Sequence, residues 1–420
     1  MRMDDPASLH IAMLGTRGVP AAYGGFETAV EEIGQRLVER GHRVTVYCRR
    51  DGDEQPKSYR GMRLVHLPAV HLKAAETLSH TGLSVAHLAF STKPDLAFVF
   101  NAANAPFVPL LRALGIPTAV HVDGLEWKRE KWSGAGRRYY LGAEKQAVRT
   151  ADALIADAQG IADYYARKFL VETELLTYGT RILRDAPSDR LAELDLRPGE
   201  YHLVVARFEP ENHVSQIVEG YLQSHARFPL VVVGSARYSG EYTAKISAMA
   251  ETDPRVRLLG GLWDQSQLDQ LYANSLTYVH GHSVGGTNPS LLRAMGGGTS
   301  VLAYDVDFNR EVLGVDGRYF TTPESLRELI DESEHHASQS HLLGQRLQRR
   351  AELEYDWDDV AEGYEALAIR LAAGYSIRNL SAVPAHPHGA HSATSSSTTH
   401  NARPRTAPRP VAHRSDSRIS

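Results

Sequence analysis

Residues 285–298 read GGTNPSLLRAMGGG and combine a permissive backbone, a helix start and one cation, Arg293. Pro289 suits the first position of a helix, where its missing N–H is no loss. The free N–H groups of the following turn attract an anion, and the glycines let a ligand approach the backbone closely. The segment therefore predicts an anion site at the start of a short helix.

A second cation stands in VARFEPENHVSQIVEGY, which overlaps the end of a strand predicted at 202–208. Arg207 is placed at the carboxyl end of that strand, where a guanidinium can bind a phosphate through two N–H groups. In doubly wound sheets, ligands bind beyond the carboxyl ends of the strands. Arg207 and the helix start at Pro289 together predict a clamp for a diphosphate that needs no metal.

Two carboxylates, Asp123 and Glu126, follow a strand predicted at 118–122, in the segment HVDGLEWKREKW. Carboxylates hold sugar hydroxyls by accepting pairs of hydrogen bonds, and an aromatic ring such as that of Trp127 covers the apolar face of a sugar. The same carboxylates can be helix caps or ion-pair partners, and both interpretations stay open. We place Asp123 and Glu126, with Arg207, among the candidate catalytic residues.

The segment GTRGVPAAYGGFET follows the first predicted strand and is rich in glycine. Gly24 and Gly25 precede a helix that begins near Phe26 and points its amides at whatever approaches them. A dinucleotide fold is the alternative, but the spacing is not G-x-G-x-x-G. The next strand also ends in Tyr47, Cys48 and Arg49, where an acid is expected to bind a ribose. A plain surface loop remains a third interpretation.

Three histidines are candidates for chemistry. His121 has the type of side chain that acts as a general base, although its position within a strand favours a packed histidine. His280 and His282 stand two residues apart at a strand end, without a third ligand to complete a metal site. We expect no metal.

These residues are positioned by short apolar runs that alternate with helical periodicity, which is typical of parallel strands joined by crossover helices. In the first helix, Val30, Ile33, Leu37 and Val38 share one face. The predicted strands are 10–14, 44–47, 95–101, 118–122 and 153–157, then 202–208, 230–235, 256–260, 276–281 and 300–304. We expect an α/β protein with two doubly wound domains that face each other across a cleft.

The domain organisation follows from changes in composition along the chain. RILRDAPSDRLAELDLRPGE is charged and short of apolar periodicity, which indicates a linker. The predicted parts are a leader at 1–8, a first domain at 9–182, a linker at 183–199, a second domain at 200–355, a helix at 356–375 and a disordered tail at 376–420.

Composition narrows the class of protein. With 420 residues, of which 42% are hydrophobic and 23% charged, the chain has the content of a soluble protein with two domains. Its net charge of -4 gives no reason to expect nucleic acid. A single cysteine, Cys48, excludes an intrachain disulfide. The start MRMDDPASLH is unlike a secretory signal, and no run reaches the roughly 18 apolar residues of a membrane span. We expect a cytoplasmic protein.

Two basic segments are compatible with contact to a membrane. GAGRRYYLGAEKQAVR, from residue 134, is basic and aromatic, and it is interpreted either as a solvated helix or as a surface that docks on a membrane. The arginines of the tail can touch anionic lipid, although a passive solvated tail is preferred.

The order and content of several segments resemble the retaining glycosyltransferases of the group 1 (family 4) type, and most closely the subgroup with a rhamnosyltransferase-like N-terminal domain. The resemblance spans about residues 9–372. It rests on GTRGVPAAYGGFETAVEEIGQRLVERGHRVTVYCR, HVDGLEWKREKW, VARFEPEN, LYANSLTYVHGHSVGGTNPSLLRAMGGG and DVDFNREVL.

The resemblance implies a GT-B fold, with the nucleotide-sugar donor held mainly by the second domain and the acceptor mainly by the first. The last helix, at 358–374, would cross back to the first domain. Such enzymes work without a divalent metal and without a cofactor beyond the donor. The leaving diphosphate is stabilised by positive charge and helix amides.

The chain departs from the wider family at three positions. Two glutamates eight positions apart are replaced by Gly285 and Arg293, and a lysine that pairs with the family's phosphate-binding arginine is replaced by Asn212. Arg293 would then either face the diphosphate or form a structural ion pair, for which Glu311 is a candidate partner. The residues expected to bind substrate are Gly24, Gly25, Gly285, Gly286, Thr287, Asn288 and Arg293.

The predicted function is the transfer of a hexose or deoxyhexose, with rhamnose favoured, from a nucleotide sugar to a glycan or lipid-linked acceptor with retention of configuration. The implied setting is the assembly of surface polysaccharide or cell-wall glycan. Peripheral contact with the inner face of the membrane is left open. The loss of the ribose-binding glutamate is compatible with a dTDP-sugar. The alternatives are a nucleotide-sugar epimerase of the same fold and a nucleotide-sugar-binding protein without catalysis.

Overall fold

The computed structural model describes residues 8–21, 24–50, 55–70, 76–122, 124, 127, 134–234 and 240–380. All of them belong to one compact unit, residues 1–382. Within this unit the chain forms two sheets, one of eight strands and one of six.

The first sheet has the strand order β3-β4-β2-β1-β5-β6-β7-β8, and only β3 runs antiparallel to its neighbour. Residues such as LAFVF at 96–100 are buried throughout, as expected for parallel strands that are covered on both faces. The strands are β1 (His10–Leu14), β2 (Arg43–Arg49), β3 (Ser58–Tyr59), β4 (Met62–Leu67), β5 (Leu96–Phe100), β6 (Thr118–His121), β7 (Ala153–Ala156) and β8 (Glu174–Leu175).

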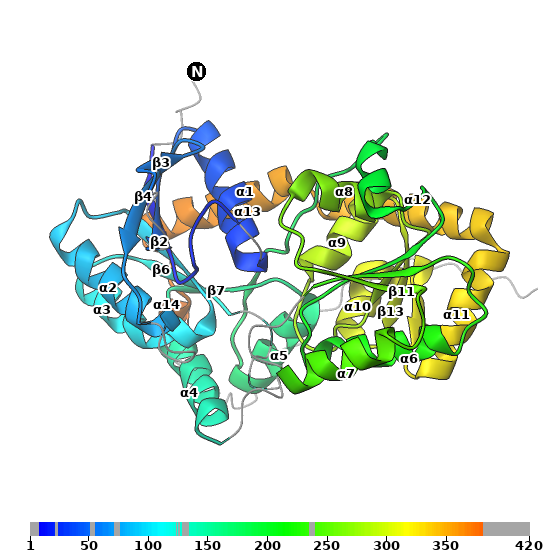
Figure 1. Ribbon diagram of the computed structural model, residues 1–420. Helices are drawn as coiled ribbons and strands as arrows, with labels where there is room; N and C mark the ends of the chain where they lie inside the picture. Colours follow the sequence, from blue (N-terminus) through cyan, green and yellow to red (C-terminus); the bar gives the residue numbers. More distant parts are fainter. Residues whose placement is uncertain are drawn as a thin grey trace, which may run out of the picture. The chain divides into compact units, whose positions relative to one another are not determined.

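Helices cover both faces of the first sheet (Figure 1). In α1, the apolar residues Val30, Ile33 and Leu37 are buried against it, as the periodicity predicts. The helices of this half are α1 (Gly25–Glu39), α2 (Glu76–Phe90), η1 (Ala102–Phe107), α3 (Val108–Ala113), α4 (Gly134–Thr150) and α5 (Gln159–Phe169).

The second sheet is parallel and has the order β11-β10-β9-β12-β13-β14. Its strands are β9 (His202–Val205), β10 (Leu230–Val233), β11 (Val256–Gly260), β12 (Thr277–His280), β13 (Ser300–Tyr304) and β14 (Arg318–Phe320). Its helices are η4 (Pro210–Asn212), α6 (Val214–Leu222), α7 (Gly240–Ala250), α8 (Gln265–Ala273), α9 (Pro289–Gly296), α10 (Asp307–Leu313), η5 (Gly314–Asp316), α11 (Pro323–His335) and α12 (Ala337–Glu354).

The segment between the sheets is partly buried. It contains the short helix η3 (Asp189–Leu194), and the side chains of Leu191 and Leu196 are buried in the hydrophobic core. Arg190 is bound to Asp264, the N-cap residue of α8. These contacts fasten the charged segment to the second sheet.

After α12 the chain returns to the first sheet. α13 (Trp357–Ala372) contacts α1 and β5, and the two helices lie side by side in Figure 1. The ring of Tyr364 meets that of Phe98 edge to face at 5.1 Å. α14 (Ile377–Leu380) follows, and the N–H of Ile377 donates to the carbonyl of Asp152. Ordered structure therefore continues into the segment that composition predicts to be a tail.

The prediction of two doubly wound α/β domains is confirmed. Three predicted strands, 10–14, 256–260 and 300–304, have the bounds of β1, β11 and β13. None of the described helices is long and apolar enough to cross a membrane.

Candidate functional site

The starts of α1 and α9 meet, although 264 positions separate Gly25 from Pro289. A Cβ atom added to Gly25 would lie 3.1 Å from Cγ of Pro289, so only glycine permits this approach without a shift. Gly24, at φ 120°, precedes α1 with a backbone conformation that side chains rarely adopt. The structure thus brings together two of the glycine-rich segments that the sequence singles out.

The loop before α9 is fixed to the carboxyl end of β7. The hydroxyl of Thr287 donates to the carbonyl oxygen of Asp157 at 2.5 Å. A Cβ atom on Gly286 would lie 2.3 Å from Oδ1 of Asp157, so a larger residue would force the loop away. Loops that follow strands of both sheets therefore converge at residues 285–289.

The start of α9 is capped by Asn288. Its side-chain oxygen accepts from the backbone N–H of Ser290 at 3.0 Å and from the Ser290 hydroxyl at 2.8 Å. The hydroxyl of Tyr278 donates in turn to Oγ of Ser290. The Asn288 oxygen is therefore used by its own helix, which fixes the direction in which the helix start points.

Arg207 lies just after β9, and its side chain is exposed. Its carbonyl oxygen accepts from Nδ2 of the buried Asn212 at 2.8 Å, which holds the backbone of this turn. Both the N–H and the hydroxyl of Ser283 donate to the carbonyl of Glu211, so the turn is joined to the loop that leads to α9. Within the part of the chain that the structure describes, the Arg207 guanidinium has no ion-pair partner.

Arg293 is bound to α8. Its guanidinium contacts Oδ1 of Asp269 at 2.6 Å and donates to the side-chain and backbone oxygens of Gln265. It also stacks over the ring of Tyr272. An ion pair is one of the two expectations for Arg293. It is present, and Asp269 is the partner. Glu311 instead accepts from the N–H groups of Gln159 and Gly160 at the start of α5.

Asp123 and Glu126 lie outside the described residues. Their neighbour Gly124 is described, and a Cβ atom on it would lie 2.7 Å from Cα of Gly285. Gly124 therefore lies against the same loop as Gly25 and Asp157 do.

Of the three candidate histidines, His121 and His280 are buried and His282 is partly buried. His121 is surrounded by the rings of Phe26, Phe100 and Tyr178, and burial lowers its pKa to about 3. Burial likewise lowers the pKa of His280 to about 3, and this ring stacks on His282 at 4.4 Å. Both His121 and His280 are neutral at ordinary pH. Among the described residues, no three His, Cys, Asp or Glu side chains are grouped to hold a metal.

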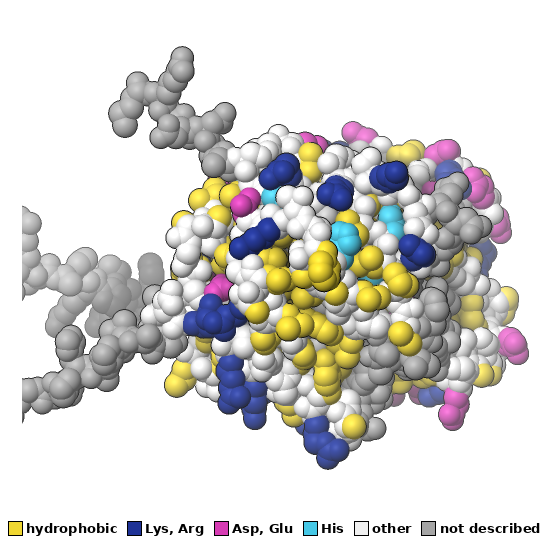
Figure 2. Space-filling model, turned by 90° about the vertical axis from the view of Figure 1, so that its left-hand side faces the viewer, with side chains coloured by type: hydrophobic (Ala, Val, Ile, Leu, Met, Phe, Trp, Pro, Cys, Tyr) yellow, Lys and Arg dark blue, Asp and Glu magenta, His cyan; other side chains and the backbone are white. Residues whose placement is uncertain are grey.

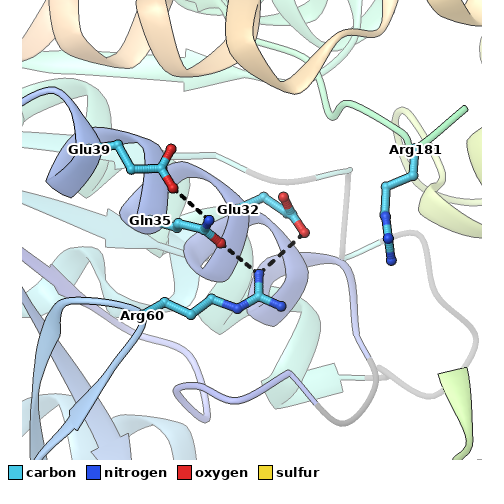
Figure 3. A pocket seen from close by; sticks show the side chains of 5 residues that line it. All are labelled: Glu32, Gln35, Glu39, Arg60 and Arg181. Carbon is cyan, nitrogen blue, oxygen red and sulfur yellow. Dashed lines mark hydrogen bonds and ion pairs between the residues drawn. The ribbon is translucent and has the colours of Figure 1, made fainter.

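A polar pocket lies along the outer side of α1, apart from the converging loops (Figure 3). Nε2 of Gln35 donates to Glu39, and the Arg60 guanidinium donates to the Gln35 side-chain oxygen at 2.8 Å. Arg181 approaches from another segment, opposite Glu32. The pocket contains none of the predicted site residues.

Sequence reasoning passed over Asp157. Its side chain is buried, its carbonyl anchors Thr287 and its carboxylate lies against Gly286. Its position at the end of a strand indicates a ligand site, as the position of Asp123 after another strand does.

Comparison with protein families matches the two halves of the chain separately. Residues 8–181 match a domain of unknown function (DUF1972), and residues 195–350 match the glycosyl transferases group 1. A comparison with curated proteins gave no match.

Solved structures resemble the chain over most of its length. Sucrose-phosphate synthase from Thermosynechococcus elongatus has a TM-score of 0.75 and 20% identity, over 87% of this chain and 99% of that chain. Anabaena HepE, in complex with UDP-glucose, has a TM-score of 0.69 and 16% identity, over 86% and 99%. A glycosyltransferase from Rickettsia africae has a TM-score of 0.66 and 10% identity, over 88% and 100%. The chain has the GT-B fold, and its residues 195–350 match the glycosyl transferases group 1.

Proposed function

We propose that the protein transfers a sugar from a nucleotide-diphosphate sugar to a glycan or lipid-linked acceptor. The observation that carries the proposal is that Arg207 and the loop leading to α9 follow the carboxyl ends of the neighbouring strands β9 and β12, and that Ser283 bonds this loop to the turn after Arg207. An exposed guanidinium and a helix start suit a diphosphate, whose negative charge grows as the bond to the sugar breaks.

The sugar is proposed to lie at the loop 285–288. Gly285 and Gly286 allow close approach to the backbone, and the contact of Thr287 with Asp157 fixes the loop before a ligand arrives. Such preorganisation lowers the entropy lost on binding. Asp123 and Glu126 are proposed to contact the transferred sugar or the acceptor, because their neighbour Gly124 lies against this loop.

The donor is proposed to be a deoxyribose nucleotide such as a dTDP-sugar, with rhamnose or another hexose as the sugar. Position 293 holds a cation that is bound to Asp269, so it supplies no carboxylate to bridge two ribose hydroxyls. HepE, in contrast, is described with UDP-glucose. The transfer is further proposed to retain the configuration of the sugar and to need no metal. It is proposed to take place in the cytoplasm, in the assembly of surface polysaccharide or cell-wall glycan.

Donor binding and turnover test this function. Sugars carried by dTDP, UDP and GDP are added to the full chain and its melting temperature is measured, since a ligand that binds only the native state must raise it. We expect the largest rise with a dTDP-sugar, and transfer of that sugar when a lipid-linked or glycan acceptor is supplied.

Product analysis separates the alternatives. Conversion of the donor to an epimer without any acceptor would overturn transfer in favour of an epimerase. Donor binding without turnover across a broad panel of acceptors would indicate a binding protein. An equal rise with all three nucleotides would contradict only the deoxyribose preference.

A further inference from the structure

The helix α2 buries polar side chains together with the apolar Val85 and Leu88, and its most exposed residues are apolar. Its buried side chains include His80, Thr81 and Ser84, each fully shielded from solvent. Its outward residues are Leu83, Ala86, Ala89 and Phe90, and Phe90 is 93% exposed. A surface helix of a soluble protein normally places apolar residues inward and polar residues outward. The outward face of α2 is therefore suited to contact with an apolar environment.

The neighbouring helix α4 has a row of exposed cations. Arg138, Lys145 and Arg149 are spaced by seven and four residues, which places them on one side of a helix. Within the described part of the chain none of the three has an ion-pair partner. The exposed Arg310 of the second domain, in contrast, is paired with Asp305.

The described acids of these helices and their connections do not neutralise this row. In the described ranges 76–122 and 134–150 the acids are Glu76, Asp95 and Glu144. Glu76 pairs with Arg49, and Glu144 is buried against Lys168. Asp95 accepts from the N–H of His10. The positive charge of α4 therefore faces solvent.

The two features belong to one layer of the first domain. α2 and α4 both pack against η1, and the hydroxyl of Tyr139 in α4 donates to the carbonyl of Ala103 in η1. α3 continues η1 and adds the exposed pair Leu110 and Arg112. Figure 2 shows this side of the molecule, with hydrophobic side chains gathered in its middle and Lys and Arg side chains around them.

From this arrangement we infer that the layer of α2, α3 and α4 docks on a membrane that contains anionic lipid. Phe90, Leu83 and Leu110 enter the boundary between headgroups and acyl chains, and Arg138, Lys145 and Arg149 bind the headgroups. The inference rests on the proposed function, because docking on a membrane would bring the protein to a lipid-linked acceptor. Its test needs neither donor nor acceptor, so its failure would leave sugar transfer untouched.

Two other occupants fit the charges poorly. A second copy of the chain, docked through the same face, would bring two unneutralised rows of cations together, which is unfavourable. The segment 381–420 carries five arginines and one aspartate, so it cannot neutralise the row either. An anionic bilayer supplies both the apolar depth and the negative charge.

Sedimentation with vesicles tests the inference on the full chain. The fraction bound is measured with phosphatidylcholine alone and with about one third phosphatidylglycerol. We expect binding only to the second, and its loss as salt is raised, because salt screens exposed charges. Each cation near an anionic surface is worth about a fivefold change in partition. The Lys145→Ala/Arg149→Ala variant should therefore bind about 25-fold more weakly.

The control is Arg197→Ala/Lys245→Ala, which removes two exposed cations from other elements of the chain and should change binding less than about twofold. Phe90→Ser should weaken binding about tenfold by removing a buried aromatic ring from the membrane. Equal binding to both kinds of vesicle, or equal losses in the two double variants, would overturn the inference. So would a dimer in sedimentation velocity that Phe90→Ser dissociates.

Discussion

The guanidinium of Arg293 on α9 lies 2.6 Å from the carboxylate of Asp269 on α8, and the two side chains are only 23% and 20% exposed. This pair occupies the position at which the chain departs from the wider glycosyltransferase family that it resembles. Its partial burial makes each charge dependent on the other.

Reversing one charge of this pair should destabilise the fold, and reversing both should restore it. Arg293→Glu places two carboxylates together and should lower the free energy of unfolding by about 1–3 kcal/mol. Arg293→Glu/Asp269→Arg should recover most of that loss. Urea denaturation of the three proteins measures it, and a double variant no more stable than Arg293→Glu would contradict a structural pair.

Arg207→Ala should weaken donor binding with little effect on stability, because the side chain is exposed and unpaired within the described residues. A hydrogen bond to a charged group is worth about 1.5–3 kcal/mol, so the dissociation constant should rise about 10- to 150-fold. Arg207→Lys keeps the charge but not the two parallel N–H groups, so its dissociation constant should lie between those of the unchanged protein and Arg207→Ala. Calorimetry with the donor measures the change. Arg197→Ala is the matched control, and a normal affinity in Arg207→Ala would remove this residue from the site.

Gly286→Ala should disturb the loop before α9. The added Cβ would lie 2.3 Å from Oδ1 of Asp157 and 2.8 Å from the side chain of Ile161, so the loop must shift. We expect a loss of about 1–3 kcal/mol in stability and a fall in transfer rate. Gly142→Ala on α4 is the control, because its added Cβ would meet no described atom within 4 Å beyond its chain neighbours and its own helix backbone. It should stabilise the protein by up to about 1 kcal/mol. Equal effects in denaturation would contradict the tight contact.

The buried His121 should make the fold sensitive to acid. Burial lowers its pKa from 6.5 to about 3, so the unfolded chain binds a proton between these values and the folded chain does not. The stabilisation is complete above pH 6.5 and is lost as the pH falls toward 3. The slope from this residue is about 1.4 kcal/mol per pH unit. His121→Phe should remove that slope in urea titrations between pH 6.5 and 4, whereas His341→Phe at an exposed position should not. An unchanged slope in His121→Phe would contradict a buried neutral ring.

Long apolar runs predicted most of the strands, because strands buried on both faces cannot be polar. The run at 202–208 was extended too far: β9 ends at Val205, and Arg207 lies in the turn that follows. β4 was missed because half of MRLVHL is only partly buried, which hides its alternation. β8 has two residues at the sheet edge, too few to leave a pattern.

The candidate site was predictable only in part. The rule that ligands bind after strands identified Arg207 and residues 285–288, because it depends on local sequence. The bond from Thr287 to Asp157 joins residues 130 positions apart, and no local pattern encodes such a distance. The partner of Arg293 could not be predicted either, since Asp269 and Glu311 are both acids and only helix packing distinguishes them.

The return of α13 to the first sheet has a consequence for synthesis on the ribosome. Trp357 packs against Gly179, and Tyr364 packs on Phe98, so a helix made late in synthesis completes the core of the first-made sheet. N-terminal domains commonly fold while the rest of the chain is still being translated. Here the part of the first sheet that α13 covers stays exposed until the whole second domain has emerged, and cutting the gene between the two halves would leave that part without its cover.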